Sequence, residues 1–434
     1  MNACIYKTEG ITVLYEYIEN IKGVEFDIHF NAGAANDPIG KAGVAHFCEH
    51  ALMGWSTKRY GRKERHDKRV EYQYTNAYTS TRDMCLKLMA TKDEIAGLVD
   101  LMCEGLNDLK YTQKEFDEEY KIVKDEILTR RKTNAGLLGL IYNKKHSKDR
   151  HITNMEYSLA GSVETLDKIT LKDIKKFIKE YIHKENATIS VAGNITKEEV
   201  NEIVSKYVSP RLRENGKIGF GRMDDKGDKG PMFFYSKPYE EGKAQIYLEY
   251  EIETKERLPY YYRENSEINN LTGKVFDELL FQHFRVKKQL CYSCAASIFQ
   301  SIDKTIAGIN IVCQEDNINE VIKEIPEFLK ELLNGYTQEL YEKCKKKLVN
   351  SLNFNVKSIQ DCVYGNFYSF DRFGDILGDD EIEYYNKLDN SITFDDIKSK
   401  IENIKNKKPT IVIISKDDKE NFDYKGYCKK ILIK

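Results

Sequence analysis

The residues best suited to chemistry lie in one short stretch, residues 43–55, which contains the pattern H-x-x-E-H. If this stretch is helical, His46 and His50 are one turn apart on the same face, and both imidazoles can reach one metal ion. Glu49 lies beside this pair and is close enough to take a proton from a water on the metal without being a ligand itself. The pattern therefore predicts metal-assisted hydrolysis.

A third metal ligand is expected on a second helix, because a catalytic zinc ion needs three protein ligands and a water. Apolar residues recur at steps of three and four over residues 116–127, which is helical periodicity. Glu119 and Glu126 are seven residues apart and share a face of this helix. One can bind the metal while the other orients a histidine ligand or holds the first glutamate. Each stretch alone also fits a plain alternative, a solvated acidic helix or a helix with two partly buried histidines.

The elements that must position these helices are strands. Residues 11–18 and 24–30 favour strands, the second with strict alternation, and residues 187–193 favour a buried strand. Thr170 and Thr196 are expected to cap two helices around that buried strand. Strands and helices therefore share one domain in the first half of the chain.

The second half repeats this plan at low similarity. Residues 244–250 correspond to the alternating strand at 24–30, and residues 409–415 correspond to the buried strand at 187–193. The two halves are therefore expected to share a similar plan of strands and helices. The second half has no H-x-x-E-H pattern, so we expect no metal there.

The length of the chain also favours two domains, because 434 residues are too many for one ordinary core. Residues 208–231 contain two prolines and five glycines among many charges, which is typical of a linker. We expect residues 1–207 to form a catalytic metal-binding domain and residues 232–434 a similar domain without metal. The predicted fold class is α+β, with each domain a mostly antiparallel sheet packed by helices.

Composition excludes several functions. The chain is 41% hydrophobic and 32% charged, and its net charge of -2 argues against a general nucleic-acid binder. No apolar run approaches the length of a membrane span. The first residues lack a basic segment followed by an apolar one, so no secretory signal is expected, and the ten cysteines are most simply free thiols. We therefore expect a cytoplasmic protein.

A basic segment follows the H-x-x-E-H stretch. Residues 56–72 contain seven lysine and arginine side chains. The interpretation we favour is a solvated helix or loop. The alternative is an electropositive rim on a cleft that attracts acidic substrate segments.

Taken together, these motifs resemble those of the pitrilysin/insulinase family of zinc peptidases, the inverzincins. In that family H-x-x-E-H is followed about 76 residues later by a glutamate ligand, and Glu126 stands 76 residues after His50. The family also has a glutamate seven residues before the ligand, which is Glu119 here. Its N-A-x-T-S segment is similar to residues 76–80. The chain resembles the half-length, two-domain type, which includes the mitochondrial processing peptidase beta subunit and its bacterial relatives.

The resemblance implies a role for each residue of the first half. His46, His50 and Glu126 are expected to bind one Zn²⁺ ion per chain, with Glu49 as the general base. Glu119 is expected to support the site by holding a ligand.

The resemblance also implies a substrate-binding surface. Asn76 and Ala77 are expected to line an edge strand to which the substrate adds as a further strand. The family pattern R-x-x-x-x-L-x-Y is matched by Arg285, Leu290 and Tyr292. A guanidinium can hold a substrate carbonyl, and a phenol can donate to a developing oxyanion. Arg285 and Tyr292 are therefore expected to contact the substrate and take part in catalysis.

The implied function is a zinc-dependent endopeptidase that cuts peptides or unfolded polypeptide segments inside a closed chamber. Half-length members of the family pair into a clamshell, so we expect a homodimer or a heterodimer with a related subunit. Two alternatives stay open: a peptidase dedicated to the leader of one ribosomally made precursor, and a non-catalytic scaffold subunit of a heterodimer. The family usually has glycines where this chain has residues 72–74, and these bulkier side chains favour a narrow substrate range.

Overall fold

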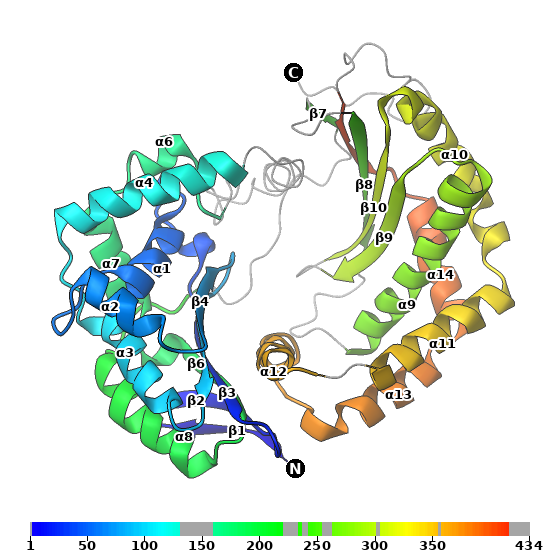
Figure 1. Ribbon diagram of the computed structural model, residues 1–434. Coiled ribbons are helices and arrows are strands. Elements are labelled where there is room, and N and C mark those ends of the chain that lie inside the picture. The colour runs from blue at the N-terminus through cyan, green and yellow to red at the C-terminus, as the bar shows by residue number, and fades with distance from the viewer. Residues whose placement is uncertain are drawn as a thin grey trace. The chain divides into compact units, whose positions relative to one another are not determined.

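The computed structural model describes residues 2–130, 159–219, 233–236, 242–253, 263–300, 304–354 and 357–415. The chain divides into two compact units, whose elements are drawn in Figure 1. The first unit is made of Met1–Arg130, His146–Met223 and Val356–Asp380, and the second of Arg131–Lys145, Asp224–Asn355 and Glu381–Lys434. Within the described residues, every helix is too short or too polar to span a lipid bilayer.

The first unit is built on a six-stranded sheet. Its strands are β1 (Ala3–Thr8), β2 (Ile11–Tyr17), β3 (Gly23–Phe30), β4 (Tyr74–Thr79), β5 (Met84–Thr91) and β6 (Ala187–Gly193). They lie in the order β1-β2-β6-β3-β5-β4, so β4 is an edge strand. The β2–β6 pairing is parallel and the other described pairings are antiparallel.

Helices pack on one face of this sheet, to the left of the strands in Figure 1. They are α1 (Val44–Gly54), α2 (Arg62–Arg69), α3 (Ile95–Asn107), α4 (Gln113–Arg130), α6 (Val163–Leu166), α7 (Leu171–Tyr181) and α8 (Lys197–Ile203). Short helical segments complete the unit: η1 (Ala34–Asn36), η2 (Lys184–Asn186), η3 (Val204–Val208), η4 (Ser209–Arg211) and η7 (Gly378–Asp380). Alternate residues of β3, among them Phe26 and Ile28, are fully buried in the core beneath the helices. Thr170 and Thr196 stand at the starts of α7 and α8, as the sequence predicted.

The other face of the sheet is polar and is covered by α12 (Ile359–Phe373), a helix from late in the chain. The ring of Phe367 stacks on His29 of β3, with 3.4 Å between the ring centroids. The Asn366 amide donates to the Glu16 carboxylate at 2.7 Å. Buried polar groups need such partners, which explains why this face recruits a helix with polar side chains.

The compact units therefore do not follow the order of the sequence. We expected residues 232–434 to form one domain, whereas Val356–Asp380 belongs to the first unit. We expected residues 208–231 to be a linker, but Leu212 is 5% exposed and Arg211 pairs with Asp100 at 2.6 Å, so 208–219 pack on the first unit. Residues 220–231 of the expected linker lie outside the described residues.

The second unit is built on a five-stranded sheet. Its strands are β7 (Phe233–Ser236), β8 (Lys243–Glu253), β9 (Ser293–Gln300), β10 (Lys304–Gln314) and β11 (Thr410–Ile414). Its helical elements are α9 (Arg263–Leu280), η5 (Phe281–Lys287), η6 (Glu315–Asn317), α10 (Ile318–Gly335), α11 (Gln338–Phe354), α13 (Glu381–Ser391) and α14 (Phe394–Lys405). The strand order is β7-β11-β8-β10-β9, with β7–β11 parallel and the other described pairings antiparallel.

The two sheets have the same topology. The order β7-β11-β8-β10-β9 repeats β2-β6-β3-β5-β4, and the parallel pair falls at the same place in each sheet. Strands β8 and β11 are the ones that the sequence matched to β3 and β6. The predicted α+β class, with two related and mostly antiparallel sheets packed by helices, is confirmed.

Candidate metal centre and active site

Helix α1, which carries the H-x-x-E-H pattern, is held at both ends by buried polar side chains. At its start, the Asp37 carboxylate accepts the backbone N–H of Gly43 at 2.6 Å and that of Ala45 at 2.7 Å. Burial raises the pKa of Asp37 to about 8, although the unpaired N–H groups and the helix dipole favour its anion. Near its end, the Arg65 guanidinium, 1% exposed, donates to the carbonyl oxygen of Leu52 at 2.7 Å. These contacts define where the histidines of α1 point.

His46, His50 and Glu126 come together between α1 and α4. An oxygen of Glu126 lies 3.6 Å from Nε2 of His46 and 3.5 Å from Nε2 of His50. Ligands that surround a zinc ion at about 2.0–2.1 Å in a tetrahedron are about 3.4 Å apart. Two of the three separations are therefore nearly those that one ion requires, and all three donor atoms, two imidazole nitrogens and one carboxylate oxygen, lie within 4.8 Å of one another. The residues present fit a zinc ion.

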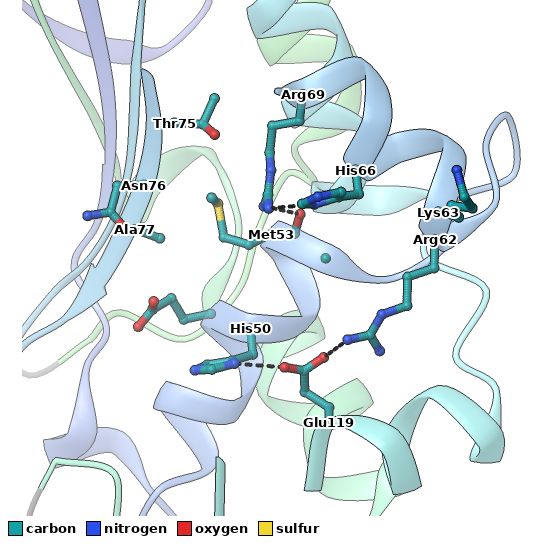
Figure 2. Close-up of a pocket in the computed structure, with 12 residues that line it drawn as sticks. His50, Met53, Arg62, Lys63, His66, Arg69, Thr75, Asn76, Ala77 and Glu119 are labelled. Carbon is teal, nitrogen blue, oxygen red and sulfur yellow. Dashed lines mark hydrogen bonds and ion pairs between the residues drawn. The ribbon is translucent and has the colours of Figure 1, made fainter. Parts of the chain in front are cut away.

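Glu119 is the partner that orients His50. Its carboxylate is 4% exposed and lies 2.8 Å from Nδ1 of His50, while the Arg62 guanidinium donates to its other oxygen at 2.6 Å (Figure 2). A proton on Nδ1 leaves Nε2 as the nitrogen that can bind a metal. Burial alone would lower the pKa of His50, but the carboxylates of Glu119 and Glu126 outweigh it and raise this pKa to about 9. The site is thus strongly attractive to a cation.

Glu49 lies on the side of α1 that faces the edge strand β4. It is 9% exposed, and the Thr79 hydroxyl donates to one of its oxygens at 2.7 Å. The hydrogen bond holds the carboxylate next to the strand where a peptide would lie. The position fits a group that moves a proton beside His50, one of the candidate metal ligands.

A pocket of about 610 Å³ opens between α1, α2 and β4. Glu49, His50 and Glu119 lie on its walls, and Asn76 and Ala77 of β4 line the opposite side. The Ala77 side chain points toward His50, whereas the Asn76 amide turns away from it (Figure 2) and donates to the Tyr74 hydroxyl at 2.9 Å. Because β4 is an edge strand of the sheet, the backbone groups on its outer side can pair with an added strand. The structure therefore brings the residues expected for substrate alignment to the same pocket as Glu49 and His50.

Arg285 and Tyr292 belong to the second unit. The Arg285 guanidinium donates to the carbonyl oxygen of Cys291 at 2.7 Å and lies 5.8 Å from the centre of the Tyr292 ring. Tyr292 is 67% exposed. The structure brings these two side chains together, and their contact with substrate stays a prediction.

Sequence reasoning missed Asp37, Arg62 and Arg65 as parts of the site, although it noted the basic segment that contains the two arginines. Arg62 and Glu119 are 57 residues apart, so no local periodicity connects them. A signal was present for Asp37, because Asp followed by a helix is the usual pattern of a capping residue. Asp37 stands six residues before Gly43 instead of directly before the helix, so it does not match the usual spacing of a capping residue.

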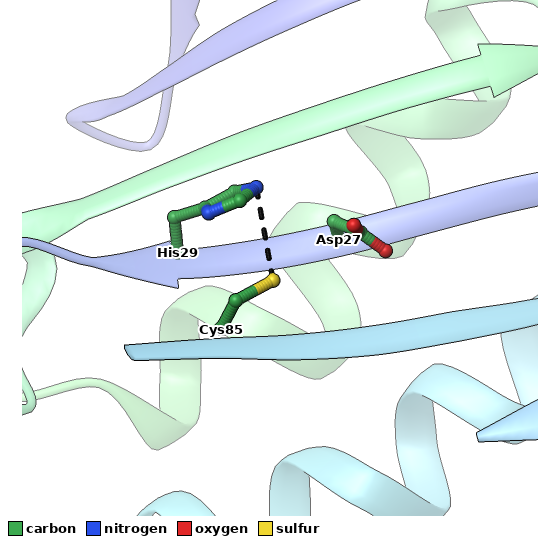
Figure 3. Close-up of side chains that lie close together, drawn as sticks. All are labelled: Asp27, His29 and Cys85. Atoms are coloured by element: carbon green, nitrogen blue, oxygen red, sulfur yellow. Dashed lines mark hydrogen bonds between the residues drawn. The ribbon is translucent and has the colours of Figure 1, made fainter. Parts of the chain in front are cut away.

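A second group of possible metal ligands lies beneath α12. Asp27, His29 and Cys85 are buried on neighbouring strands, with 3.7 Å between Sγ of Cys85 and Nε2 of His29 (Figure 3). The Lys87 ammonium is 3.4 Å from the Asp27 carboxylate and 3.2 Å from that of Glu25. This side chain already supplies a positive charge at the place a cation would take, so we assign the group to the packing of α12.

Comparisons with known proteins identify the family. A model of "Insulinase (Peptidase family M16)" matches residues 12–160, and a model of "Peptidase M16 inactive domain" matches residues 168–348. The chain is 29% identical over 201 residues to "Zinc protease PqqE" of Helicobacter pylori, covering 46% of this chain and 44% of that protein. It is 22% identical over 354 residues to "Uncharacterized zinc protease YmxG" of Bacillus subtilis, covering 80% and 83%. A crystal structure of a protease from Helicobacter pylori superposes with a TM-score of 0.78 at 20% identity, covering 95% of this chain and 99% of that one.

Together the two models span most of the chain, and the chain belongs to peptidase family M16, of the half-length, two-domain type. The resemblance noted in the sequence is confirmed. The model named for the peptidase matches the part that contains His46, His50 and Glu126. The model named for an inactive domain begins after these residues.

Proposed function

We propose that the chain is a zinc-dependent endopeptidase that cuts peptides or unfolded segments of polypeptide. The observation that carries this proposal is the position of one Glu126 oxygen 3.6 and 3.5 Å from the Nε2 atoms of His46 and His50. Such a donor set suits zinc, with room for a water as a further ligand. When bound, the ion lowers the pKa of a water and polarises the substrate carbonyl.

The protein's own residues perform the other steps. A peptide pairs with the outer edge of β4, which presents its backbone beside α1. Glu49, held by Thr79, accepts a proton from the attacking water and later gives it to the leaving nitrogen of the cut bond. Glu119 keeps the proton of His50 on Nδ1, so that Nε2 is available as a ligand.

The complete donor set supports an active peptidase over a scaffold subunit, because a scaffold has no need for three converging ligands and a held glutamate. Asn76 and Ala77 are proposed to align the substrate from β4. Arg285 and Tyr292 are proposed to complete the site, either from the same chain or from a second subunit. Sedimentation of the active protein tests this last point, and full activity of an isolated monomer would argue against the clamshell dimer.

A mixture of unstructured peptides tests the proposed function. The purified protein is loaded with zinc, incubated with the mixture, and the products are read by mass spectrometry. We expect cuts that disappear when a chelator removes the metal and return when zinc is added back. Many unrelated cuts would favour general degradation, and a few cuts would favour processing of one precursor. Absence of cuts with zinc bound would contradict a self-sufficient peptidase.

A further inference from the structure

One wall of the pocket beside the metal ligands is basic. Helix α2 contributes Arg62, Lys63, His66 and Arg69 to this wall, which faces β4 across the pocket (Figure 2). We expected the basic segment to be a solvated face, but these four side chains line the pocket. Whether each positive charge is already paired with a carboxylate determines which ligand groups the pocket can bind.

The positive charge of Arg62 is already balanced. Its guanidinium donates to Glu119 at 2.6 Å and lies 3.8 Å from Glu118. Lys63 is 88% exposed and pairs with Asp67 at 2.5 Å. An exposed pair of this kind is weak, so the ammonium can turn to another anion at little cost.

Arg69 differs from Arg62 because no described carboxylate lies within ion-pair distance of its guanidinium. It donates to the carbonyl oxygen of Met53 at 3.1 Å and to Nδ1 of His66 at 3.3 Å. These two bonds leave three of its five N–H donors for other partners. Burial lowers the pKa of Arg69, and no described carboxylate offsets this effect. A half-buried guanidinium with open donors is a site for a carboxylate.

The number of β4 residues between Glu49 and the basic wall predicts which substrate side chain would reach that wall. Thr79 holds Glu49, while Ala77 and Thr75 line the pocket on the way to the basic wall. Residues two apart on a strand share a face, and each residue advances about 3.3 Å. A strand added along β4 would therefore present to α2 the side chains about two to four residues from the scissile bond.

We infer that the pocket binds an acidic side chain of the substrate, about two to four residues from the scissile bond, and that Arg69 selects it. The inference rests on the proposed peptidase function and names its substrate class. The ligand is a carboxylate, which a peptide can offer from Asp or Glu or from its own carboxyl terminus. Test peptides must separate these two sources.

The test uses one peptide that the wild-type protein cuts, acetylated and amidated at its ends. Variants of this peptide carry Glu or Gln at each position flanking the scissile bond, and kcat/KM is measured for each. We expect Glu to exceed Gln by about ten- to a hundredfold at one position, since a charge-assisted hydrogen bond is lost with Gln. This ratio should shrink at high salt. The Gln peptide with a free carboxyl terminus shows whether a terminal carboxylate can substitute.

Three variants locate the selectivity in Arg69. In Arg69→Gln the Glu-to-Gln ratio should fall to about one, and in Arg69→Lys most of the preference should remain. Lys68→Gln is the matched control, because Lys68 lies on the same helix but stacks over the Tyr60 ring outside the pocket. It should keep the wild-type ratio. Thermal unfolding of each variant verifies that it is folded.

The outcomes separate this inference from the proposed function. Equal cutting of the Glu and Gln peptides by the wild type, or an unchanged ratio in Arg69→Gln, would overturn the inference and leave the peptidase standing. Preference for only the free carboxyl terminus would also overturn it. If no peptide is cut, binding of the same peptides to the Glu49→Gln variant decides: tighter binding of the Glu peptide supports the pocket, and equal binding rejects it.

Discussion

The contact between Glu119 and His50 gives the sharpest prediction about metal binding. Glu119→Gln keeps the size of the side chain but removes the charge that faces Nδ1 of His50 at 2.8 Å and Arg62 at 2.6 Å. Loss of such an orienting partner weakens metal binding by about ten- to a hundredfold, which is about 1.4–2.7 kcal/mol. The substitution also removes the ion pair between Glu119 and Arg62. Because the Arg62 side chain is 30% exposed, water solvates its guanidinium in place of Glu119, and the loss of this ion pair adds little to the change in zinc affinity.

The assay is a competition titration of zinc between the protein and a coloured chelator at constant pH. Glu118→Gln is the control, because Glu118 is the neighbouring residue, is 45% exposed and lies 3.8 Å from Arg62. The control should bind zinc within about twofold of the wild type, as exposed pairs contribute little. Equal affinities of Glu119→Gln and Glu118→Gln would refute the reasoning that Glu119 orients a ligand.

Three further predictions concern stability. Asp37→Ala leaves two backbone N–H groups at the start of α1 unpaired and should lower the free energy of unfolding by about 1–3 kcal/mol, measured in urea, with weaker zinc binding as well. Burial, together with the nearby Glu25, raises the pKa of Asp27 from 3.8 to about 8, so its contribution to stability is present at low pH and is lost as the pH rises towards 8. The free energy of unfolding should fall by at most about 1.4 kcal/mol per pH unit because of this group. In Asp27→Asn the free energy of unfolding, measured from pH 5 to 8, should depend less on pH. Removing the metal should lower the melting temperature, because zinc at a thousandfold excess over its Kd stabilises the folded state by about 4 kcal/mol; a melting curve unchanged by chelator would contradict the site.

Much of the candidate metal site follows from the sequence because it depends on local spacing. His46 and His50 share a helical face, and so do Glu119 and Glu126, wherever the two helices lie. The internal repeat likewise predicted two related sheets. What the spacing left open was which glutamate faces both imidazoles, and the structure brings Glu126 to them.

The rest depends on contacts between distant parts of the chain. The alternation in β3, with polar Asp27 and His29, predicts a strand with one exposed face, yet both residues are buried and Phe367 of α12 stacks on His29. The partner of His29 is Phe367, more than 300 residues later, and no periodicity reports such a contact. Arg69 is a further example. From the sequence it is expected on a solvated face of α2, and only the position of β4 shows that it lines a pocket.

The most direct test of the account measures zinc content and peptide cutting on the same samples of wild type, Glu49→Gln and Glu126→Gln. The account predicts one zinc per chain in the wild type and in Glu49→Gln, with cutting slowed about a hundredfold or more in the latter. Glu126→Gln should lose both zinc and cutting. Cutting by Glu49→Gln at the wild-type rate, or a full zinc content in Glu126→Gln, would contradict the assignment of base and ligand.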